Sequence, residues 1–298
     1  MPFTPVAEQA ITLKTTKTTC PYCGVGCGVL ATPKKDGTVE IAGDATHPAN
    51  LGRLCVKGSA LGQTVGLDGR ILQPLVRSAS QAGESGARGT HFSATTWDEA
   101  LATTAAKFQH IINEHGPEAV AFYVSGQLLT EDYYVANKFV KGWLGTGNID
   151  TNSRLCMSSA VVGHKRAFGE DLVPVCYEDF DHADLIVLTG SNTAWCHPVV
   201  FQRIQAAREK NPNLKLVVID PRRTATCESA DLHLPIKGGS DVWLFNGLLN
   251  YLYEHGIEDV AFVEQHAQGL QAALKAAQDT THISKQCGVP QHMLEEFY

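Results

Sequence analysis

The stretch Cys20-Pro21-Tyr22-Cys23-Gly24-Val25-Gly26-Cys27, followed later by Leu54-Cys55-Val56-Lys57-Gly58, decides how the N-terminal part of this sequence folds. Glycines between the first three cysteines permit positive φ values and close backbone approach, so the three sulfurs can turn towards one point. A fourth cysteine arrives from a distance and completes a set of four thiolates: Cys20, Cys23, Cys27 and Cys55. Such a set suits tetrahedral zinc or a four-iron cluster.

The spacing of these cysteines favours the cluster. Zinc ribbons usually bring their ligands as two separated Cys-x-x-Cys pairs, whereas here three cysteines share one loop and the fourth is remote. A compact loop plus one remote cysteine is typical of a 4Fe–4S cluster. A disulfide framework is disfavoured, because nine cysteines are an odd number and residues 1–19 do not look like a secretion signal. Zinc stays the alternative.

The composition is that of an ordinary soluble protein, with 298 residues, 44% of them hydrophobic and 18% charged. A formal net charge of −7, with no block of lysine and arginine, argues against a nucleic-acid partner. The longest apolar runs, such as 183–190, are too short for a membrane span. Residues 1–19 contain neither a twin-arginine pair nor an apolar signal core, so we expect a cytoplasmic protein.

The N-terminal residues predict a small β-rich unit around the metal centre. Residues 29–32 and 38–41 are β-prone runs separated by a turn that contains Asp36-Gly37, which is a strong hairpin signal. Residues 12–60 cannot bury much apolar surface by themselves, so the cluster would supply the missing stability. A polar connection rich in glycine and serine follows over 61–95 and is densest at 78–89.

The rest of the chain predicts an α/β fold. A helix begins at the capping box formed by Thr96 and Glu99 and ends at Gly116-Pro117. Further strands are expected at 119–124, 184–189, 214–219 and 232–236, and further helices at 130–143, 160–167, 198–210, 241–253 and from about 290. Alternating strands and helices indicate a largely parallel, Rossmann-like sheet. We therefore expect a β-rich cluster domain over 1–62, a partial α/β domain over 63–142 and a Rossmann-like domain over 143–298.

Loops that follow the predicted strands could hold a nucleotide, because ligands of open parallel sheets bind at the carboxyl ends of the strands. These loops contain Gly190, Ser191 and Asn192, then Asp220, and then Gly239, Ser240 and Asp241. The G-x-G-x-x-G fingerprint of NAD-binding proteins is absent, which argues against an ordinary dehydrogenase. Ordinary turns with an N-capping aspartate are the plain alternative. Together the loops suggest a nucleotide-bearing ligand other than NAD.

Cys156 and Lys57 each allow two interpretations. Cys156 precedes a predicted helix, where a thiolate is favoured, and it could bind a soft metal or act as a nucleophile. A buried, inert cysteine is nevertheless the commoner reading of such a residue. Lys57 could be a solvated charge, or it could reach from the cluster towards an electron-exchanging partner. The remaining cysteines have no partner spacing and are interpreted as structural: Cys176, Cys196, Cys227 and Cys287.

Taken together, these residues resemble the molybdopterin oxidoreductases that carry an N-terminal 4Fe–4S cluster and a molybdenum bis-(molybdopterin guanine dinucleotide) cofactor. The resemblance covers the chain from about residue 16 onward. Its motifs are the four cysteines, residues 54–58, Trp97-Asp98-Glu99-Ala100-Leu101, Gly190-Ser191-Asn192 and Asp220-Pro221-Arg222. Within the family, residues 152–160 and 190–198 are most similar to the bacterial assimilatory nitrate reductases.

The resemblance implies a role for each of these residues. Cys156 would be the protein ligand to molybdenum, and Met157 follows it where formate dehydrogenases of the family usually have a histidine. Lys57 would lie between cluster and pterin as an electron relay. One guanine dinucleotide would be held by Gln127, Asn152, the loop 189–196 with Gly190, Ser191 and Asn192, then Asp220, Pro221 and Arg222, and Gly239, Ser240 and Asp241.

The implied activity is reduction of nitrate to nitrite by oxygen-atom transfer, with electrons entering through the cluster from an electron donor protein or reductase subunit. Family members continue for several hundred residues beyond this length, so we expect a fragment of a larger enzyme with little activity alone. Two alternatives stay open. One is a molybdenum formate dehydrogenase with a cysteine ligand, and the other is a non-catalytic module that binds zinc or a cluster.

Overall fold

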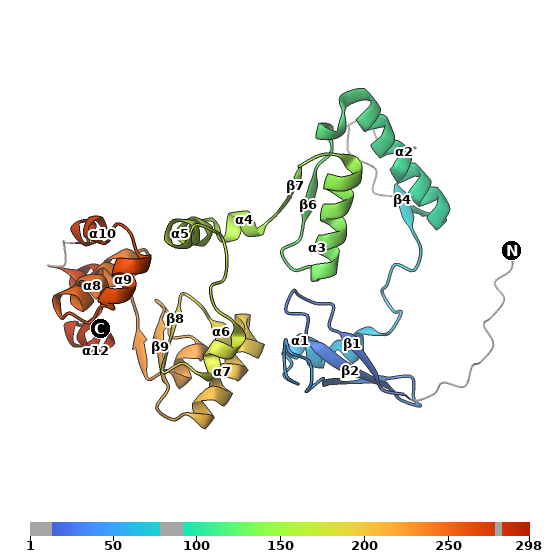
Figure 1. Cartoon of the computed structure of the whole chain (residues 1–298). Helices are drawn as coiled ribbons and strands as arrows, with labels where there is room; N and C mark the ends of the chain where they lie inside the picture. Colours follow the sequence, from blue (N-terminus) through green and yellow to red (C-terminus); the bar gives the residue numbers. More distant parts are fainter. Residues whose placement is uncertain (1–13, 78–91, 278–281) are drawn as a thin grey trace. The chain divides into compact units, whose positions relative to one another are not determined.

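The computed structural model describes residues 14–77, 92–277 and 282–298. The chain divides into two compact units, Met1–Leu172 and Val173–Tyr298, and each is described by itself (Figure 1). The domain boundaries expected at 62/63 and 142/143 stay predictions. Within the described ranges, no helix is both long enough and apolar enough to cross a membrane.

The first unit begins with the expected small sheet. Its strands β1 (Thr16–Thr19), β2 (Gly28–Pro33) and β3 (Val39–Gly43) are antiparallel and lie in the order β1-β2-β3. The predicted hairpin is confirmed: β2 pairs with β3, and the Asp36 carboxylate accepts hydrogen bonds from the amide and hydroxyl of Thr38 at 3.0 and 2.7 Å. The strand β1 was not predicted.

The loop after β3 brings two backbone segments into direct contact. A Cβ atom added to Gly43 would lie 2.0 Å from the carbonyl oxygen of Gly52, so no side chain fits at Gly43 while that contact persists. Gly52 has φ +82° and the preceding Leu51 has φ +46°, which are left-handed conformations that favour glycine. This turn leads the chain towards Cys55.

The remaining elements of the first unit are short, apart from one helix. They are α1 (Val56–Ser59), β4 (Leu75–Arg77), β5 (Phe92–Ala94), α2 (Trp97–His115), β6 (Phe122–Val124), α3 (Thr130–Asn137), β7 (Ile149–Thr151), α4 (Ser153–Cys156) and α5 (Ser158–Phe168). The predicted capping box is present at the start of α2, where the Glu99 amide donates to the Thr96 hydroxyl at 3.2 Å. The glycine- and serine-rich stretch 78–89 lies outside the described residues.

Two expectations for the first unit were wrong in extent. The strand expected at 119–124 is reduced to β6, because Pro117–Ala119 forms a 3-10 turn. It is also not fully buried, since Tyr123 is exposed. The helix expected at 130–143 changes after Asn137 into the π-helical segment Lys138–Leu144. The strand β7, which was not predicted, pairs with β6 in parallel.

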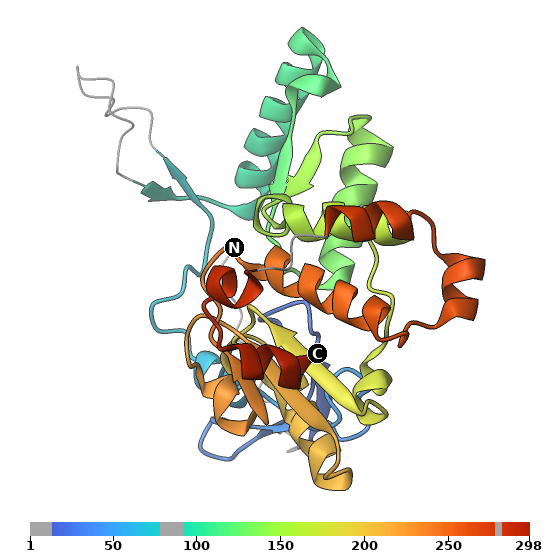
Figure 2. The same ribbon diagram turned by 90° about the vertical axis from the view of Figure 1, so that its left-hand side faces the viewer.

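The second unit is built on a parallel sheet with the order β10-β9-β8. Its strands are β8 (Leu185–Thr189), β9 (Lys215–Ile219) and β10 (Leu232–Leu234). Its α-helices are α6 (Thr193–Cys196), α7 (Pro198–Lys210), α8 (Asp241–Glu254), α9 (Val260–His266), α10 (Leu270–Ala276), α11 (Ile283–Cys287) and α12 (Gln291–Phe297). Figure 2 shows these strands side by side with helices next to them. The expected α/β class, with a strand-rich beginning, is confirmed.

Helices cover both faces of this sheet. Along β9, Leu216 and Val218 belong to one buried cluster, whereas Val217 and Ile219 belong to another. Because successive side chains of a strand point to opposite faces, the two clusters lie on opposite sides of the sheet. The first contains residues of α7, and the second contains residues of α8, α11 and α12. The cover is incomplete at the edge strand β8, where Leu185 and Val187 are 52% and 36% exposed.

Candidate functional site

The three-cysteine loop is closed by hydrogen bonds within its own backbone. The Cys20 amide donates to the Cys27 carbonyl at 2.9 Å, and the Gly26 amide donates to the Cys23 carbonyl at 3.2 Å. Gly26 has φ +62°, a conformation that suits glycine. Cys20 and Cys27 are buried, whereas Cys23 and Cys55 are half-buried. Two of the three cysteines of this loop are thus shielded from solvent.

The buried Cys27 thiol is affected by the other three cysteines of the set. The pKa of Cys27 is raised from 9.0 to about 11, first by burial and then by the charges of Cys20, Cys23 and Cys55. Four soft, mutually repelling thiolates are stabilised when metal ions neutralise them. The donor set therefore fits an iron–sulfur cluster by the type of its ligands.

The arrangement required by a single metal ion, such as zinc, differs from that required by a cluster. Among the residues that the structure describes, no three His, Cys, Asp or Glu side chains are grouped so that they could hold one ion. A four-iron cluster requires another geometry, because each thiolate binds a separate iron.

The segment that carries Cys55 is joined to the cysteine loop by the side chain of Asn50, which sequence reasoning missed. Its carboxamide oxygen accepts from the Gly28 amide at 2.9 Å, and its nitrogen donates to the carbonyls of Gly28 at 3.1 Å and Arg53 at 2.8 Å. Asn50 is 2% exposed. An asparagine in a proline- and glycine-containing loop gives no sequence signal of burial, because such residues are ordinary in exposed turns.

Lys57 is exposed on α1 and lies beside the cysteine loop. Its Nζ atom is 5.9 Å from the centre of the Tyr22 ring, which is within reach of a cation–π contact. Tyr22 stands between Cys20 and Cys23 in the loop. The position agrees with a charge next to a cluster, and the electron-relay role stays a prediction.

The carboxyl ends of β6 and β7 bring two predicted residues near each other. Gln127 and Asn152 are exposed and follow these two parallel strands. A Cβ atom added to Gly126 would lie 2.6 Å from Oδ1 of Asn152, so the two loops touch and a side chain at Gly126 would displace the amide. The prediction that Gln127 and Asn152 share a ligand is compatible with this contact.

Cys156 is the last residue of α4 and is exposed. Its amide donates to the Asn152 carbonyl at 3.2 Å, and Met157 separates it from α5. The burial that the sequence alone favoured for Cys156 is therefore wrong, and its role as a metal ligand stays a prediction. Cys227 and Cys287 are buried, as expected of structural residues, whereas Cys176 and Cys196 are exposed.

The second unit places the other predicted loops at neighbouring strand ends. Gly190, with φ +60°, follows β8, and its amide donates to the Ile219 carbonyl at the end of β9 at 2.8 Å. Asp220 follows β9, is 7% exposed and accepts from the Arg222 amide at 2.8 Å. The third loop contains Gly239, with φ +80°, and Ser240, and Asp241 begins α8.

The loops after β8 and β9 are connected by Thr226, another residue that sequence reasoning missed. The Thr226 hydroxyl donates to the Asn192 side-chain oxygen at 3.0 Å and accepts from the Ala194 amide at 3.1 Å. Thr226 is completely buried. It lies in the 3-10 segment Ala225–Ser229, so one hydroxyl fixes Asn192 from the neighbouring loop.

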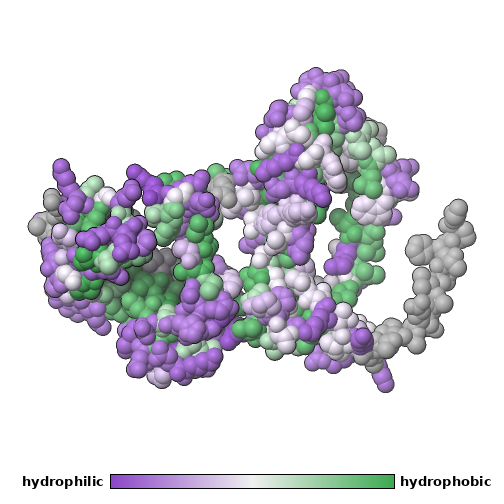
Figure 3. Space-filling view, in the orientation of Figure 1, coloured by the Kyte–Doolittle hydropathy of each residue, from purple (hydrophilic) through white to green (hydrophobic). Residues whose placement is uncertain are grey.

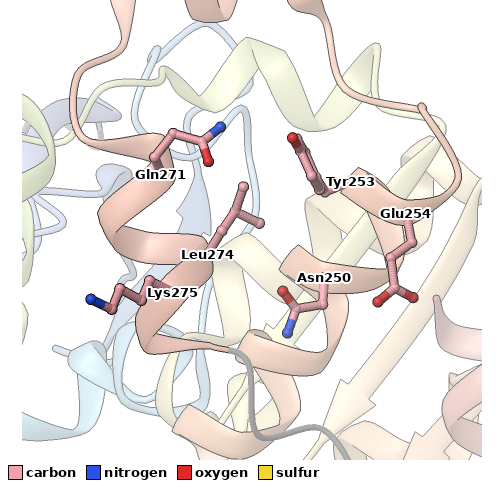
Figure 4. A pocket seen from close by; sticks show the side chains of 6 residues that line it. All are labelled: Asn250, Tyr253, Glu254, Gln271, Leu274 and Lys275. Carbon is pink, nitrogen blue, oxygen red and sulfur yellow. The ribbon is translucent and has the colours of Figure 1, made fainter.

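A cavity of the second unit lies elsewhere. Its volume is about 500 Å³, and Figure 4 shows its lining residues, which come from α8 and α10: Asn250, Tyr253, Glu254, Gln271, Leu274 and Lys275. None of the predicted site residues lines it. The Asn250 amide is already hydrogen-bonded to the carbonyl of Ala277.

Comparison with known families gives two matches. The family described as "Molybdopterin oxidoreductase" matches residues 70–278, and the one described as "Molybdopterin oxidoreductase Fe4S4 domain" matches residues 13–66. The second range contains all four cysteines of the N-terminal set.

The relatives are longer than this chain. A nitrate reductase of Klebsiella oxytoca is 53% identical over 285 residues, which cover 95% of this chain and 31% of the relative. A nitrate reductase of Shewanella frigidimarina is 47% identical over 293 residues, which cover 95% and 30%. The chain thus spans about a third of the length of these curated relatives.

A solved structure also matches. Acetylene hydratase from Pelobacter acetylenicus has a TM-score of 0.78 and 25% sequence identity, with 95% of this chain and 38% of that chain covered. Its name describes a hydratase rather than a nitrate reductase. The shared fold therefore does not by itself fix a reaction.

Proposed function

The chain belongs to the molybdopterin oxidoreductase family, and on that basis we propose that it is part of a molybdenum-dependent reductase that converts nitrate to nitrite. The observation that carries the proposal is the set of Cys20, Cys23, Cys27 and Cys55, all of which lie in the stretch 13–66 matched by the family's Fe4S4 domain. Identities of 53% and 47% to nitrate reductases support nitrate as the substrate.

The four cysteines would hold a 4Fe–4S cluster through which electrons enter. The half-buried positions of Cys23 and Cys55 leave the cluster accessible to an electron donor protein or reductase subunit. Lys57 would place a positive charge beside the reduced cluster and support electron transfer towards the molybdenum cofactor. The partial burial of the thiols would limit the access of water.

The molybdenum cofactor, in its bis-(molybdopterin guanine dinucleotide) form, supplies the redox and Lewis-acid chemistry of oxygen-atom transfer when it is bound. The exposed Cys156 thiolate would be its protein ligand. Met157 next to it cannot exchange a proton, unlike the histidine expected in a formate dehydrogenase, and this favours nitrate.

The strand-end loops would hold one guanine dinucleotide. The Asp220 carboxylate can accept hydrogen bonds from ribose hydroxyls, as acidic residues at strand ends do. The backbone at Gly190 and Gly239 leaves open space where a Cβ atom would stand, so a phosphate or ring can approach. Five further residues belong to the proposed set: Ser191, Asn192, Pro221, Ser240 and Asp241. The positive charge of Arg222 and the amides of Gln127 and Asn152 suit phosphate and base atoms.

We also propose a domain division and a cellular location for the protein. The domains would be a cluster domain over 1–62, a partial α/β domain over 63–142 and a dinucleotide-binding domain over 143–298. The resemblance of residues 152–160 and 190–198 to assimilatory enzymes supports a cytoplasmic location. Cell fractionation followed by immunodetection of the protein tests the location.

The function is tested in a full-length setting, because the chain spans 31% of its relative. Residues 1–298 replace the matched segment of the Klebsiella oxytoca enzyme, and nitrite formation is measured with reduced methyl viologen as the donor. We expect activity in this chimera and its loss in Cys156→Ser, with the iron content unchanged. Formate-dependent dye reduction without nitrite formation would favour the formate dehydrogenase alternative.

Metal analysis separates the non-catalytic alternative. The purified chain, prepared without oxygen, should contain about four irons and four acid-labile sulfides, as a 4Fe–4S cluster requires. One zinc per chain and no sulfide would replace the proposal with a structural zinc module.

A further inference from the structure

Asn50 makes a dense set of hydrogen bonds next to the cysteines. Its carboxamide binds both backbone groups of Gly28, accepting from the amide at 2.9 Å and donating to the carbonyl at 3.1 Å. The same nitrogen donates to the Arg53 carbonyl at 2.8 Å. Gly28 directly follows Cys27, and Arg53 lies two residues before Cys55. One buried side chain thus joins the two segments that carry the cysteine ligands.

The surroundings of Gly28 make this contact specific. A Cβ atom added to Gly28 would lie 2.3 Å from the ring of His47, so the imidazole lies directly over the glycine. The Gly28 carbonyl also accepts from the Asp44 amide at 2.9 Å. The backbone at Gly28 is therefore fixed from the loop 44–53, and Asn50 provides the side-chain part of that attachment.

The chemistry of the contact requires a carboxamide. An asparagine side chain has one carbonyl oxygen, which accepts, and one NH2 group, which has two hydrogens to donate. Here the oxygen accepts from the Gly28 amide, and the NH2 group donates to the carbonyls of Gly28 and Arg53. An aspartate has the same shape but, when ionised, can only accept, so it would face two carbonyl oxygens without a donor. A shorter side chain would leave buried backbone groups unpaired.

We infer that Asn50 is a positioning residue of the four-cysteine site. By holding Gly28 and Arg53 together, it sets the distance between the Cys27 and Cys55 sulfurs, and with it the retention of the iron bound by Cys55 and the reduction potential of the cluster. This inference rests on the proposed 4Fe–4S cluster.

The test compares two variants with a matched control in the full chain, prepared and reconstituted with iron and sulfide without oxygen. Asn50→Asp keeps the shape and removes the donors, and Asn50→Ala removes the side chain. The control is Asp44→Asn in the same loop. The Asp44 side chain contacts Lys17 and Thr46, and its contact with Gly28 is made by backbone alone.

The measurements are irons and sulfides per chain, the electron paramagnetic resonance spectrum after dithionite reduction, the midpoint potential and the far-ultraviolet circular dichroism. We expect Asp44→Asn to lower the thermal midpoint while the cluster content, spectrum and potential stay those of the wild type. Asn50→Asp should retain the fold but shift the potential to a more negative value and change the spectrum. Asn50→Ala should lose iron faster than the control when a chelator is added.

Wild-type cluster content, spectrum and potential in a folded Asn50→Asp would overturn the inference. Loss of the fold in both Asn50 variants while Asp44→Asn stays folded would also overturn it, because the amide would then serve general stability rather than ligand spacing. A failure of the proposed function can be told apart from this result, because the wild-type chain itself would then bind zinc or contain no sulfide.

Discussion

Two parallel sheets among the described residues present predicted cofactor residues from the same ends of their strands, yet they differ in how deeply their side chains are buried. The sheet β8–β9–β10 has a buried cluster on each face. Beside the pair β6–β7, the ring of Phe122 stacks on Phe108 of α2 and meets Phe139 of the π-helical segment edge-on. The helices α2 and α3 contain no buried residue among those described, and the buried side chains of this region are few, such as Val120 and Val140. Trp97 and Trp143 are 67% and 74% exposed in this region, and Figure 3 shows hydrophobic residues at the surface where α2 lies.

The two regions share a local pattern of strands and helices but differ in how much apolar surface is buried around the strands. Parallel sheets are normally covered on both faces, because their backbone and apolar side chains need protection from water. The central strand β9 of the three-stranded sheet meets that requirement within residues 173–298. The two-stranded pair presents site residues Gln127 and Asn152 without a comparable core.

The largest expected difference is in the cooperativity of unfolding when residues 173–298 and residues 92–172 are produced as separate proteins. Residues 173–298 should unfold cooperatively in urea, because the central strand β9 has a buried cluster on each of its sides. Residues 92–172 alone should show no cooperative transition. Circular dichroism against urea concentration checks both. A cooperative transition in 92–172 would break the comparison, since it would show that this region is stable without a large buried core.

The next effect is expected in the core of the larger sheet. Leu234 is completely buried, and Leu234→Ala should lower the free energy of unfolding of residues 173–298 by about 2–5 kcal/mol, as other buried leucines do. Leu185 in the same sheet is 52% exposed and is the matched control. Leu185→Ala should cost well under half as much. Equal costs would contradict the burial pattern.

A smaller effect is expected at the contact between the site loops. Thr226→Val keeps the volume of the side chain but leaves the Ala194 amide without its acceptor, which should cost about 1–3 kcal/mol. Thr224, two residues away, has a long contact of 3.7 Å with the Cys227 sulfur and serves as the control. Thr224→Val should change the free energy less. Thr226→Ser should restore most of the wild-type value.

The smallest effects are those of pH on the free energy of unfolding. The first unit should lose stability at acid pH and the second at alkaline pH. Hydrogen bonds from Lys17 and Thr46 lower the pKa of Asp44 from 3.8 to about 2. The first unit should therefore lose stability as the pH falls from 3.8 to about 2, because the unfolded state binds the proton first.

In the second unit, burial raises the pKa of Tyr298 from 10.0 to about 12, with a further contribution from Cys287. The unfolded state then releases its proton first, so stability should decline as the pH rises from 10.0 to about 12. Tyr298→Phe should flatten the alkaline decline, and Asp44→Asn should flatten the acid one. Unfolding in urea at several pH values checks both, and an unchanged slope in either variant would contradict that assignment.

Features encoded by neighbouring residues could be predicted from the sequence. The Asp36-Gly37 hairpin and the Thr96–Glu99 capping box depend on side chains within four positions of each other, and both are present. The strand–helix alternation of 184–253 was predicted for the same reason. The four-cysteine set was recognisable because metal ligands must be particular residue types at particular spacings.

Features made by distant residues could not be predicted. The bond between Asn50 and Gly28 spans 22 positions, and that between Thr226 and Asn192 spans 34. A single sequence does not reveal which polar side chain crosses such a gap. The strand β7 was missed because three residues give no periodic pattern, and the exposure of Cys156 depends on packing that local sequence does not encode.

The contact between Gly43 and Gly52 has a consequence for how this protein can vary. Because one backbone lies against the other, a change at Gly43 cannot be relieved by trimming a neighbouring side chain, as a crowded leucine could be. A library of random codons at both positions, selected for cells that retain the iron-loaded protein, should return glycine at Gly43 in nearly every surviving clone. We therefore expect Gly43 to tolerate almost no substitution as the sequence changes over time.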